Sequence, residues 1–378
     1  MFIKKKIPVS KTNLPHHSDI YPYLQDIKND DSTCGRRPLV NHLKTRFQEL
    51  FGTEKGTVAI TSNAVYALAN TLKALDVPAN SYCLMPSWCS PSIPYAATYA
   101  GLTPYFVDVD NDTWTLDVKN TVESLMYIKQ EIGAVIVPSS IGETINTKEW
   151  DKFTEETGVP VIIGASNSFD NVTSQSKSVI SDTPIVVGFN HNSLLCFGEG
   201  AVIVSKNKKL IEKIDNISTF GFGDELYKIY IGTNGIMTEY NAAVCHAALD
   251  SWDSTRAKWN TINNYYIETF IETTLQHRLS FEYLSSTCNI YLLANNADST
   301  IDYLKSKGIE ARKWTGNGCH NMKEFQNAPK TSLPVTENLI SSVIGLPYYL
   351  GITKKDIELV VRTLSSNVYG KKIHFRNA

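Results

Sequence analysis

Short runs rich in Val and Ile alternate with amphipathic segments along much of this chain, and this alternation restricts the fold more than any other feature. The predicted strands cover residues 57–60, 82–85, 104–107, 134–137, 159–163, 185–189 and 201–204. Helical patterns lie between several of them, over residues 37–51, 63–75, 91–99 and 147–157. Apolar strands separated by helices are typical of an α/β fold with a mostly parallel central sheet flanked by helices. Ligands of such sheets bind at the carboxyl ends of the strands.

The second part of the chain has a less regular pattern. A long helix is predicted near residues 241–266, and short strands and helices mix over residues 281–293 and towards the end of the chain. We therefore expect a large α/β domain over residues 1–250 and a smaller C-terminal α+β domain over residues 251–378.

Charge and cysteine content restrict the class of protein. The 378 residues include 36 Lys and Arg against 38 Asp and Glu, so the net charge of -2 gives no general electrostatic reason to bind nucleic acid. No apolar run is long enough to span a membrane, and the start of the chain lacks the apolar stretch of a signal peptide. The seven cysteines are scattered without a C-x-x-C pair, which predicts free thiols, no metal site and a cytoplasmic location.

Several short motifs occur in an order that resembles one known family. They are Gly35 before the first predicted helix, Thr61-Ser-Asn-Ala, Pro86-Ser-Trp, the run from Gly101 to Asp110, Gly198-Glu-Gly-Ala, residues 234–239, Val335-Thr-Glu-Asn and Gly345-Leu-Pro-Tyr-Tyr. Over nearly the whole chain they resemble the sugar aminotransferases of the DegT/DnrJ/EryC1/StrS family. The resemblance implies the aspartate-aminotransferase fold (fold type I of the pyridoxal-phosphate enzymes), a homodimer with shared sites, and nucleotide-linked sugars as substrates.

The same resemblance identifies where the family's cofactor groups would stand. The lysine that binds pyridoxal phosphate lies five residues before the Gly-Glu-Gly turn, a position that Ser193 occupies here. The carboxylate that pairs with the pyridine nitrogen corresponds to Gly164, and the stacking aromatic corresponds to Ser90. The H-x-Y-G stretch reads Ser139-Ser140-Ile141-Gly142.

These replacements remove the groups that hold and activate pyridoxal phosphate. A serine hydroxyl cannot form an imine, so Ser193 cannot bind the cofactor covalently. Glycine at position 164 supplies no counter-charge for a protonated pyridine ring. The sequence therefore predicts a divergent member of the family without pyridoxal phosphate.

Other residues are candidates for binding a substrate. Ser62 and Asn63 precede a predicted helix whose N-terminus would bind an anion. The remaining substrate-binding candidates are Trp88, Ser90 and Asn234, together with Arg36 and Arg37 for a diphosphate. The loop after the strand at 185–189 holds His191, a candidate general base, next to Ser193, a candidate oxyanion donor.

Three functions remain open at this stage. The first is an enzyme of bacterial O-antigen or surface-polysaccharide biosynthesis that transfers an acyl group, from a donor such as acyl-CoA, to the amine of a nucleotide-linked amino sugar without pyridoxal phosphate. The second is a catalytically silent partner subunit of a true sugar aminotransferase. The third is an atypical aminotransferase or dehydratase that uses pyridoxal or pyridoxamine phosphate.

Overall fold

The predicted mostly parallel sheet is present and has seven strands. The computed structural model describes residues 6–29, 37–139, 141–142, 146–221, 231–271, 273, 275, 277–278 and 289–369. The strands of the large sheet are β1 (Val58–Thr61), β2 (Tyr82–Pro86), β3 (Thr103–Val107), β4 (Ile132–Pro138), β5 (Val161–Gly164), β6 (Ile185–Phe189) and β7 (Gly200–Val204). Their spatial order is β1-β7-β6-β5-β4-β2-β3, and only β7 runs antiparallel to its neighbours.

Successive residues of each strand enter two different cores, because side chains alternate between the faces of a sheet. On one face Val58 and Ile60 pack with helices α2 (Pro38–Phe51), α6 (Thr147–Thr157) and α7 (Phe169–Ser174). On the other face Ala59 packs with α3 (Ala64–Ala74), α4 (Ser92–Tyr99) and α9 (Lys208–Ser218). The remaining helices of this part are α1 (His17–Asn29), α5 (Val118–Tyr127) and α8 (Ser176–Val179). Helices on both faces explain why the strands are apolar throughout.

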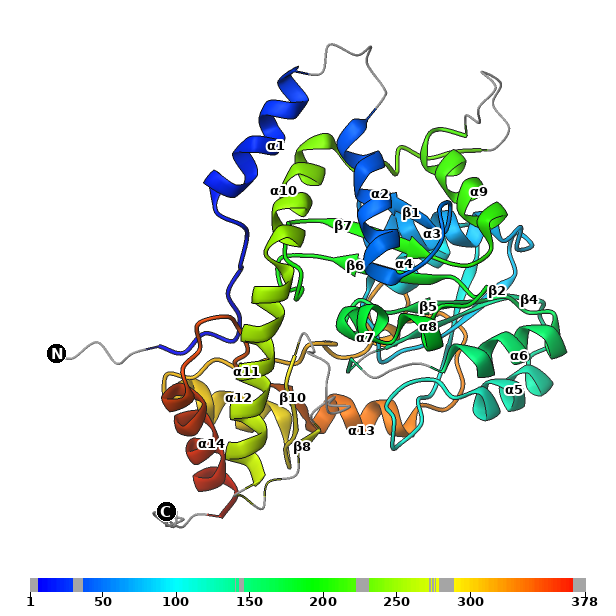
Figure 1. Ribbon diagram of the computed structural model, residues 1–378. Helices are drawn as coiled ribbons and strands as arrows, with labels where there is room; N and C mark the ends of the chain where they lie inside the picture. The colour runs from blue at the N-terminus through cyan, green and yellow to red at the C-terminus, as the bar shows by residue number, and fades with distance from the viewer. Residues whose placement is uncertain are drawn as a thin grey trace.

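The predicted long helix over 241–266 is two helices, so that prediction is wrong in detail. Helix α10 (Glu239–Asp250) ends at Ser251, and α11 (Trp252–Ile271) continues from there. The hydroxyl of Ser251 donates to the carbonyl of Ala248 at 3.1 Å, a local bond that competes with helix continuation. Helix α11 then runs away from the large sheet towards the C-terminal elements (Figure 1).

The C-terminal region contains a second, three-stranded sheet. Its strands are β8 (His277–Arg278), β9 (Tyr291–Leu293) and β10 (Val343–Gly345), in the order β10-β9-β8. Its helices are α12 (Ala297–Ser306), the short 3-10 helix η1 (Cys319–Asn321), α13 (Pro334–Ser342) and α14 (Lys354–Tyr369). Much of the predicted 281–293 segment lies outside the described residues. The domain boundary at residue 250 stays a prediction.

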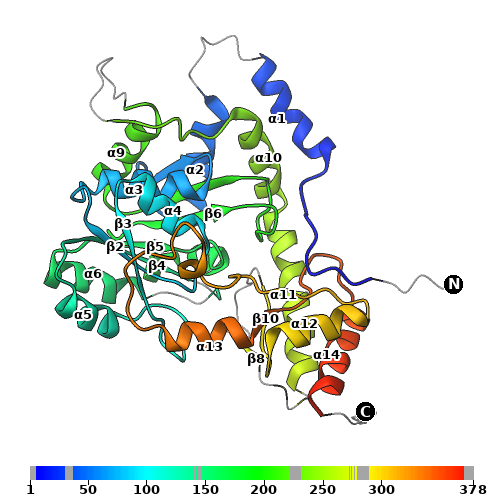
Figure 2. The ribbon, with the colours of Figure 1, turned by 180° about the vertical axis from the view of Figure 1, so that it is seen from behind.

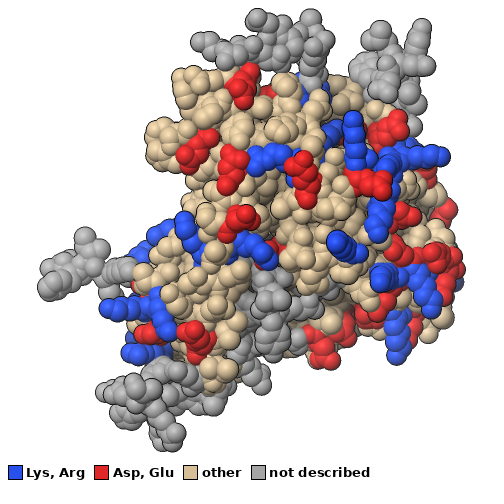
Figure 3. Space-filling model, viewed as in Figure 1, with Lys and Arg blue, Asp and Glu red and all other residues tan. Residues whose placement is uncertain are grey.

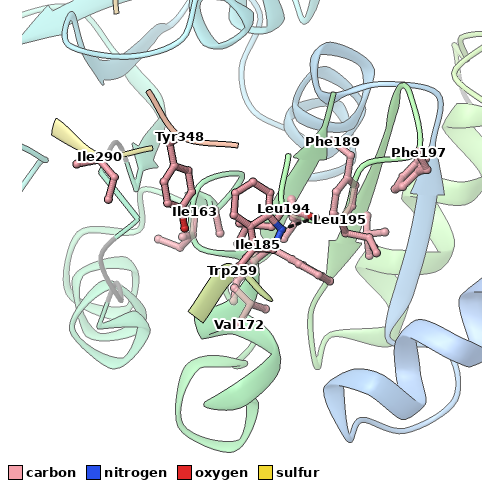
Figure 4. Packing of buried hydrophobic residues seen from close by; sticks show 14 of the residues in the cluster. Ile163, Val172, Ile185, Phe189, Leu194, Leu195, Phe197, Trp259, Ile290 and Tyr348 are labelled. Carbon is pink, nitrogen blue, oxygen red and sulfur yellow. Dashed lines mark hydrogen bonds between the residues drawn. The ribbon is translucent and has the colours of Figure 1, made fainter. Parts of the chain in front are cut away.

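Long-range contacts connect the two sheets. Near the N-terminus, Ile7 forms a parallel bridge with Ile309, so this segment joins the C-terminal region rather than the large sheet. In the core, the indole of Trp259 on α11 stacks on Tyr348 with ring centroids 4.9 Å apart. Figure 4 shows this pair beside Leu194 and Leu195 of the loop after β6. One continuous apolar core therefore extends from the large sheet to the C-terminal region.

The surface carries no dominant sign of charge on the face shown in Figure 3, where acidic and basic side chains are interspersed. This agrees with the near balance of 36 basic and 38 acidic residues. Among the described residues, no helix combines the length and apolar character needed to cross a membrane.

A buried histidine makes the stability of the fold dependent on pH. His246 on α10 is fully buried, its Nδ1 lies 3.0 Å from Nη1 of Arg46, and its Nε2 contacts the carbonyl of Leu39. Burial, with the Arg46 charge as a lesser cause, lowers the pKa of His246 to about 4. The unfolded chain has its histidine pKa near ~6.5 and takes up the proton first, so stability is complete above that value and is lost as the pH falls towards 4.

We expect the free energy of unfolding to fall by about 2 kcal/mol between about pH 7 and about pH 5 through this group. His246→Gln removes the titration and should flatten the pH dependence by that amount. Urea unfolding of both proteins at the two pH values measures it. Equal slopes for the wild type and His246→Gln would show that His246 is not responsible.

Candidate functional site

A cavity of about 820 Å³ opens at the carboxyl ends of the parallel strands. Residues that end or follow four of these strands line it, namely Ser90 after β2, Ser139 after β4, Gly164 at the end of β5 and Asn190 after β6. This is the edge at which open α/β sheets bind ligands. The backbone topology therefore gathers polar residues that are far apart in sequence.

Ser193 lies in the cavity wall on a loop that the core holds in place. Its neighbours Leu194, Leu195 and Phe197 are buried, and the indole N–H of Trp259 donates to the carbonyl of Leu194 at 3.3 Å (Figure 4). The Ser193 side chain is itself buried, and its Oγ accepts a hydrogen bond from the backbone N–H of Asn190 at 2.9 Å. The hydroxyl proton can then be donated to a ligand in the cavity.

Gly164 and Gly188 form part of the cavity wall beside Ser166. A Cβ at Gly188 would stand 2.5 Å from the Cβ of Ala64, so glycine allows α3 to approach β6 closely. A Cβ at Gly164 would come no closer than 3.5 Å to another atom, so this position can accept a side chain. The Oγ of Ser166 accepts from the N–H of Gly188 at 3.0 Å.

The N-terminus of helix α3 closes one end of the cavity. Asn63 caps the helix, with its side-chain oxygen accepting from the N–H of Tyr66 at 3.0 Å. The amides of Ala64 and Val65 lie in the first turn and have no partner in the helical ladder. Both residues line the cavity together with Asn63 and are placed to bind an anion.

The structure does not bring every predicted residue to the cavity. His191 is exposed and is absent from the cavity lining, so its assignment as general base is wrong for this chain's cavity. The loop turns it outwards because its neighbours Leu194 and Phe197 fill the core. Trp88 is also corrected: only 2% of it is exposed, and it packs in a core cluster with Trp114 and Ile340 instead of meeting a substrate.

Ser62, Arg37 and Asn234 lie outside the cavity lining of the single chain as well. Arg37 precedes α2, and Asn234 is exposed in a bridge with Thr219. A role for Asn234 in a site shared between two subunits stays a prediction, as do a role for Arg37 in binding a diphosphate and the homodimer. Arg36 lies outside the described residues.

The carboxylate of Asp170 forms an ion pair with Arg256 on α11. It is fully buried and lies 2.5 Å from Nε of Arg256 on α11. An ion pair of this kind holds α7 against α11 and leaves the carboxylate poorly suited to proton transfer in the cavity. Cys89 lines the cavity, and burial raises the pKa of its thiol well above the usual value, which makes it a weak nucleophile.

Sequence reasoning missed one wall of the cavity entirely. Asn289, Tyr291, Trp314 and Thr315 line it from the C-terminal region. The available signal was the adjacent indole and hydroxyl of Trp314-Thr315, in a segment otherwise rich in Gly and Asn.

Comparison with known proteins gives relatives of the same length and fold. A dTDP-4-amino-4,6-dideoxy-D-glucose transaminase of Escherichia coli is 24% identical over 373 residues, covering 95% of this chain and 98% of the relative. The crystal structure of DesI in the presence of its TDP-sugar product superposes with a TM-score of 0.83 at 23% identity, covering 97% of this chain and 94% of DesI. NtdA of Bacillus subtilis, solved with bound cofactor PMP, gives a TM-score of 0.79 at 19% identity over 92% of this chain and 80% of NtdA.

These relatives correct the prediction that the chain works without pyridoxal phosphate. The E. coli relative is a transaminase, and the NtdA structure holds pyridoxamine phosphate (PMP) in the same fold. The prediction from Ser193 and Gly164 that the chain uses no pyridoxal phosphate is therefore wrong. The prediction of acyl transfer without the cofactor loses its basis, since the comparisons favour transamination.

The match extends beyond individual relatives. The sequence model of the DegT/DnrJ/EryC1/StrS aminotransferase family matches residues 17–365. That range includes both sheets and every residue of the cavity wall. The predicted α/β aminotransferase fold is confirmed, and the chain belongs to the DegT/DnrJ/EryC1/StrS aminotransferase family.

Proposed function

We propose that this chain is a sugar-modifying transaminase that binds pyridoxal or pyridoxamine phosphate by contacts alone, without a covalent bond, and acts on a nucleotide-linked sugar. The observation that carries the proposal is the convergence of Ser193, Gly164 and the N-terminus of α3 on one cavity. That cavity has the family's position at the sheet edge, yet a hydroxyl stands where the resemblance puts the lysine.

The phosphate end of the cavity fits the cofactor. The amides of Ala64 and Val65 point out of the first turn of α3, where the helix dipole favours negative charge. Asn63 fixes this turn through its cap. A phosphate here needs no lysine or arginine in contact with it.

The described cavity wall has no residue placed to bind the cofactor covalently. Ser193 forms no imine, and Lys73 is the one lysine among the residues that line the described cavity. Lys73 lies in the last turn of α3, about 13 Å along the helix axis from its first turn, because each residue advances the helix by about 1.5 Å. The residues present therefore fit the cofactor as a reversibly bound group.

A buried oxygen supports the binding of a ligand that carries hydrogen-bond donors. The side-chain oxygen Oδ1 of Asn192 is buried at the cavity wall and has no partner among the described residues. An unpaired buried acceptor costs about 1–3 kcal/mol, and a ligand amine or hydroxyl would remove that cost.

When bound, the ring of the cofactor would supply the electron sink, and pyridoxamine phosphate would supply the amino group that replaces the keto oxygen of the sugar, which leaves as water. The chain's own residues bind the phosphate at Ala64 and Val65, donate a hydrogen bond from Ser193 Oγ, and accept one at Asn192 Oδ1. Gly188 keeps α3 against β6 so that these groups face one space. The nucleotide-linked sugar is proposed from the E. coli and DesI relatives, and a place in O-antigen or surface-polysaccharide biosynthesis stays a prediction.

To test this, purified protein is incubated with pyridoxamine phosphate and with dTDP-, UDP- or GDP-linked keto sugars. Mass spectrometry then detects whether the keto sugar has become an amino sugar. We expect conversion of one keto sugar to its amino sugar, and no conversion without added cofactor. Binding of cofactor and sugar without conversion would leave the silent-partner function in place. Absence of both binding events would overturn the proposal.

A further inference from the structure

The C-terminal region forms one wall of the cavity with uncharged residues, which we call the neutral wall. Asn289, Tyr291, Trp314 and Thr315 carry no formal charge, whereas Lys73 and Glu199 line the cavity from the large-sheet side. A wall of one amide, two aromatic rings and two hydroxyls suits a neutral group rich in hydroxyls and C–H surface better than a phosphate. The neutral wall therefore suits the sugar of a substrate, whereas the N-terminus of α3 is the proposed site of the cofactor phosphate.

Two members of the neutral wall carry polar atoms that the protein leaves unused. Trp314 Nε1 and Thr315 Oγ1 are buried and have no hydrogen-bond partner in the described part of the chain. Buried polar groups without partners are rare in native proteins, since each costs about 1–3 kcal/mol. A ligand hydroxyl would satisfy Thr315 Oγ1. Trp314 Nε1 lies against Gly345, so Trp314 can meet a sugar only with the remaining surface of its ring.

The position of Trp314 is closely determined. The guanidinium carbon of Arg312 stacks on its ring, 3.7 Å from the ring centroid. A Cβ at Gly345 on β10 would stand 1.9 Å from Trp314 Nε1, so the indole edge lies directly against this glycine. One face and one edge of the ring are thus fixed by the protein.

Trp314 and Thr315 belong to a segment, residues 313–333, that we call the strap. Figure 2 shows the strap running from the C-terminal sheet across the large sheet before the chain returns in α13. The N–H of Phe106 on β3 donates to Pro329, and the N–H of Thr331 donates back to Phe106, which fixes the far end of the strap. These contacts make the strap part of the large-sheet edge instead of a loose loop.

A histidine fixes the near end of the strap. The backbone N–H of His320 donates to Ser87 Oγ at 3.0 Å, and Ser87 Oγ lies 2.5 Å from His320 Nδ1. With Nδ1 taken as the acceptor of the Ser87 hydroxyl proton, Nε2–H donates to a carboxylate oxygen of Glu337 at 2.7 Å. Both Ser87 and His320 are buried, so this contact is shielded from water.

We propose that Trp314 and Thr315 determine which sugar the cavity accepts, and that His320 is a positioning residue that sets the strap for them. This inference rests on the proposed function, because it assigns the sugar of a nucleotide-linked substrate to the neutral wall. The nucleotide diphosphate would then lie away from this wall.

The experiment measures binding of a dTDP-linked sugar and of bare dTDP to the wild type and to variants by calorimetry. We expect Trp314→Ala and Thr315→Val each to weaken binding of the sugar conjugate by about tenfold or more, and to leave binding of bare dTDP within about twofold. Gly345→Ala should act like Trp314→Ala, since it displaces the indole without changing it. Asn317→Ala, an exposed position on the same strap, is the matched control and should change neither ligand.

Two substitutions of His320 test its positioning role. His320→Ala should raise KM for the sugar with little change in kcat, whereas His320→Asn, whose amide oxygen can replace Nδ1 as the acceptor for Ser87, should restore most of the loss. Equal effects of both variants, or a fall in thermal stability without a change in KM, would overturn the positioning role.

The outcomes separate this inference from the proposed function. If the wild type binds no nucleotide-linked sugar, the proposed function fails and the inference fails with it. If the wild type binds one and the wall variants bind it equally well, or lose bare dTDP equally, only the assignment of Trp314 and Thr315 is overturned.

Discussion

Ser193→Lys should convert a protein that cannot bind pyridoxal phosphate covalently into one that can. The side chain at 193 is buried in the cavity wall, so a lysine there would hold its amine away from bulk water. Desolvation lowers the pKa of such an amine and favours the neutral form that reacts with an aldehyde. The expected result is a cofactor adduct that borohydride fixes, detected by mass spectrometry of the intact chain.

Adding Gly164→Asp should strengthen the effect. A side chain at 164 meets no atom closer than 3.5 Å from its Cβ, and a carboxylate there supplies the counter-charge for a protonated pyridine ring. We expect the double variant to carry on the order of one fixed cofactor per chain, the single Ser193→Lys less, and Gly164→Asp alone none. Ser193→Gln, similar in length without an amine, is the control. A fixed adduct in the wild type would contradict the account.

Arg256→Leu should be among the most destabilising single changes in this fold. It removes the guanidinium that lies 2.5 Å from the fully buried carboxylate of Asp170, although Arg256 itself is only partly buried. Removing one member of a buried ion pair costs about 3–5 kcal/mol, because the remaining charge stays desolvated. Urea unfolding measures the loss.

Two further variants test that explanation. Asp170→Asn combined with Arg256→Leu removes both charges and should recover a large part of the stability. Lys152→Leu breaks an exposed pair with Glu156 and should cost less than about 0.5 kcal/mol. If Arg256→Leu costs no more than Lys152→Leu, the pair does not hold α7 against α11.

The sequence predicted the layers of this fold because burial on both faces of the sheet leaves a local trace. The strand Ile185–Phe189 and the helix Thr147–Thr157 were predicted with the bounds that the structure has. The antiparallel direction of β7 was not predicted, since a run of apolar residues carries no information on strand direction. The break at Ser251 was missed for a similar reason, because serine alone does not end an apolar helical pattern.

The site was predictable only where motif spacing fixed it. Gly164 and Ser193, which the resemblance gave as the positions of the family's carboxylate and lysine, both line the cavity. His191 was misplaced because the direction of a side chain in a loop depends on which neighbours enter the core. Trp314 and Thr315 were missed because contacts between residues far apart in sequence leave no local pattern.

The most direct test of the central claim is titration of the wild type with pyridoxamine phosphate. This ligand has an amine in place of the aldehyde, so no lysine is needed to bind it, and the phosphate end at Ala64 and Val65 can hold it. The account predicts saturable binding of one ligand per chain, fully reversed by dialysis, with pyridoxal phosphate competing for the same site and leaving no adduct after borohydride. Absence of binding, or a cofactor that dialysis does not remove, would contradict it.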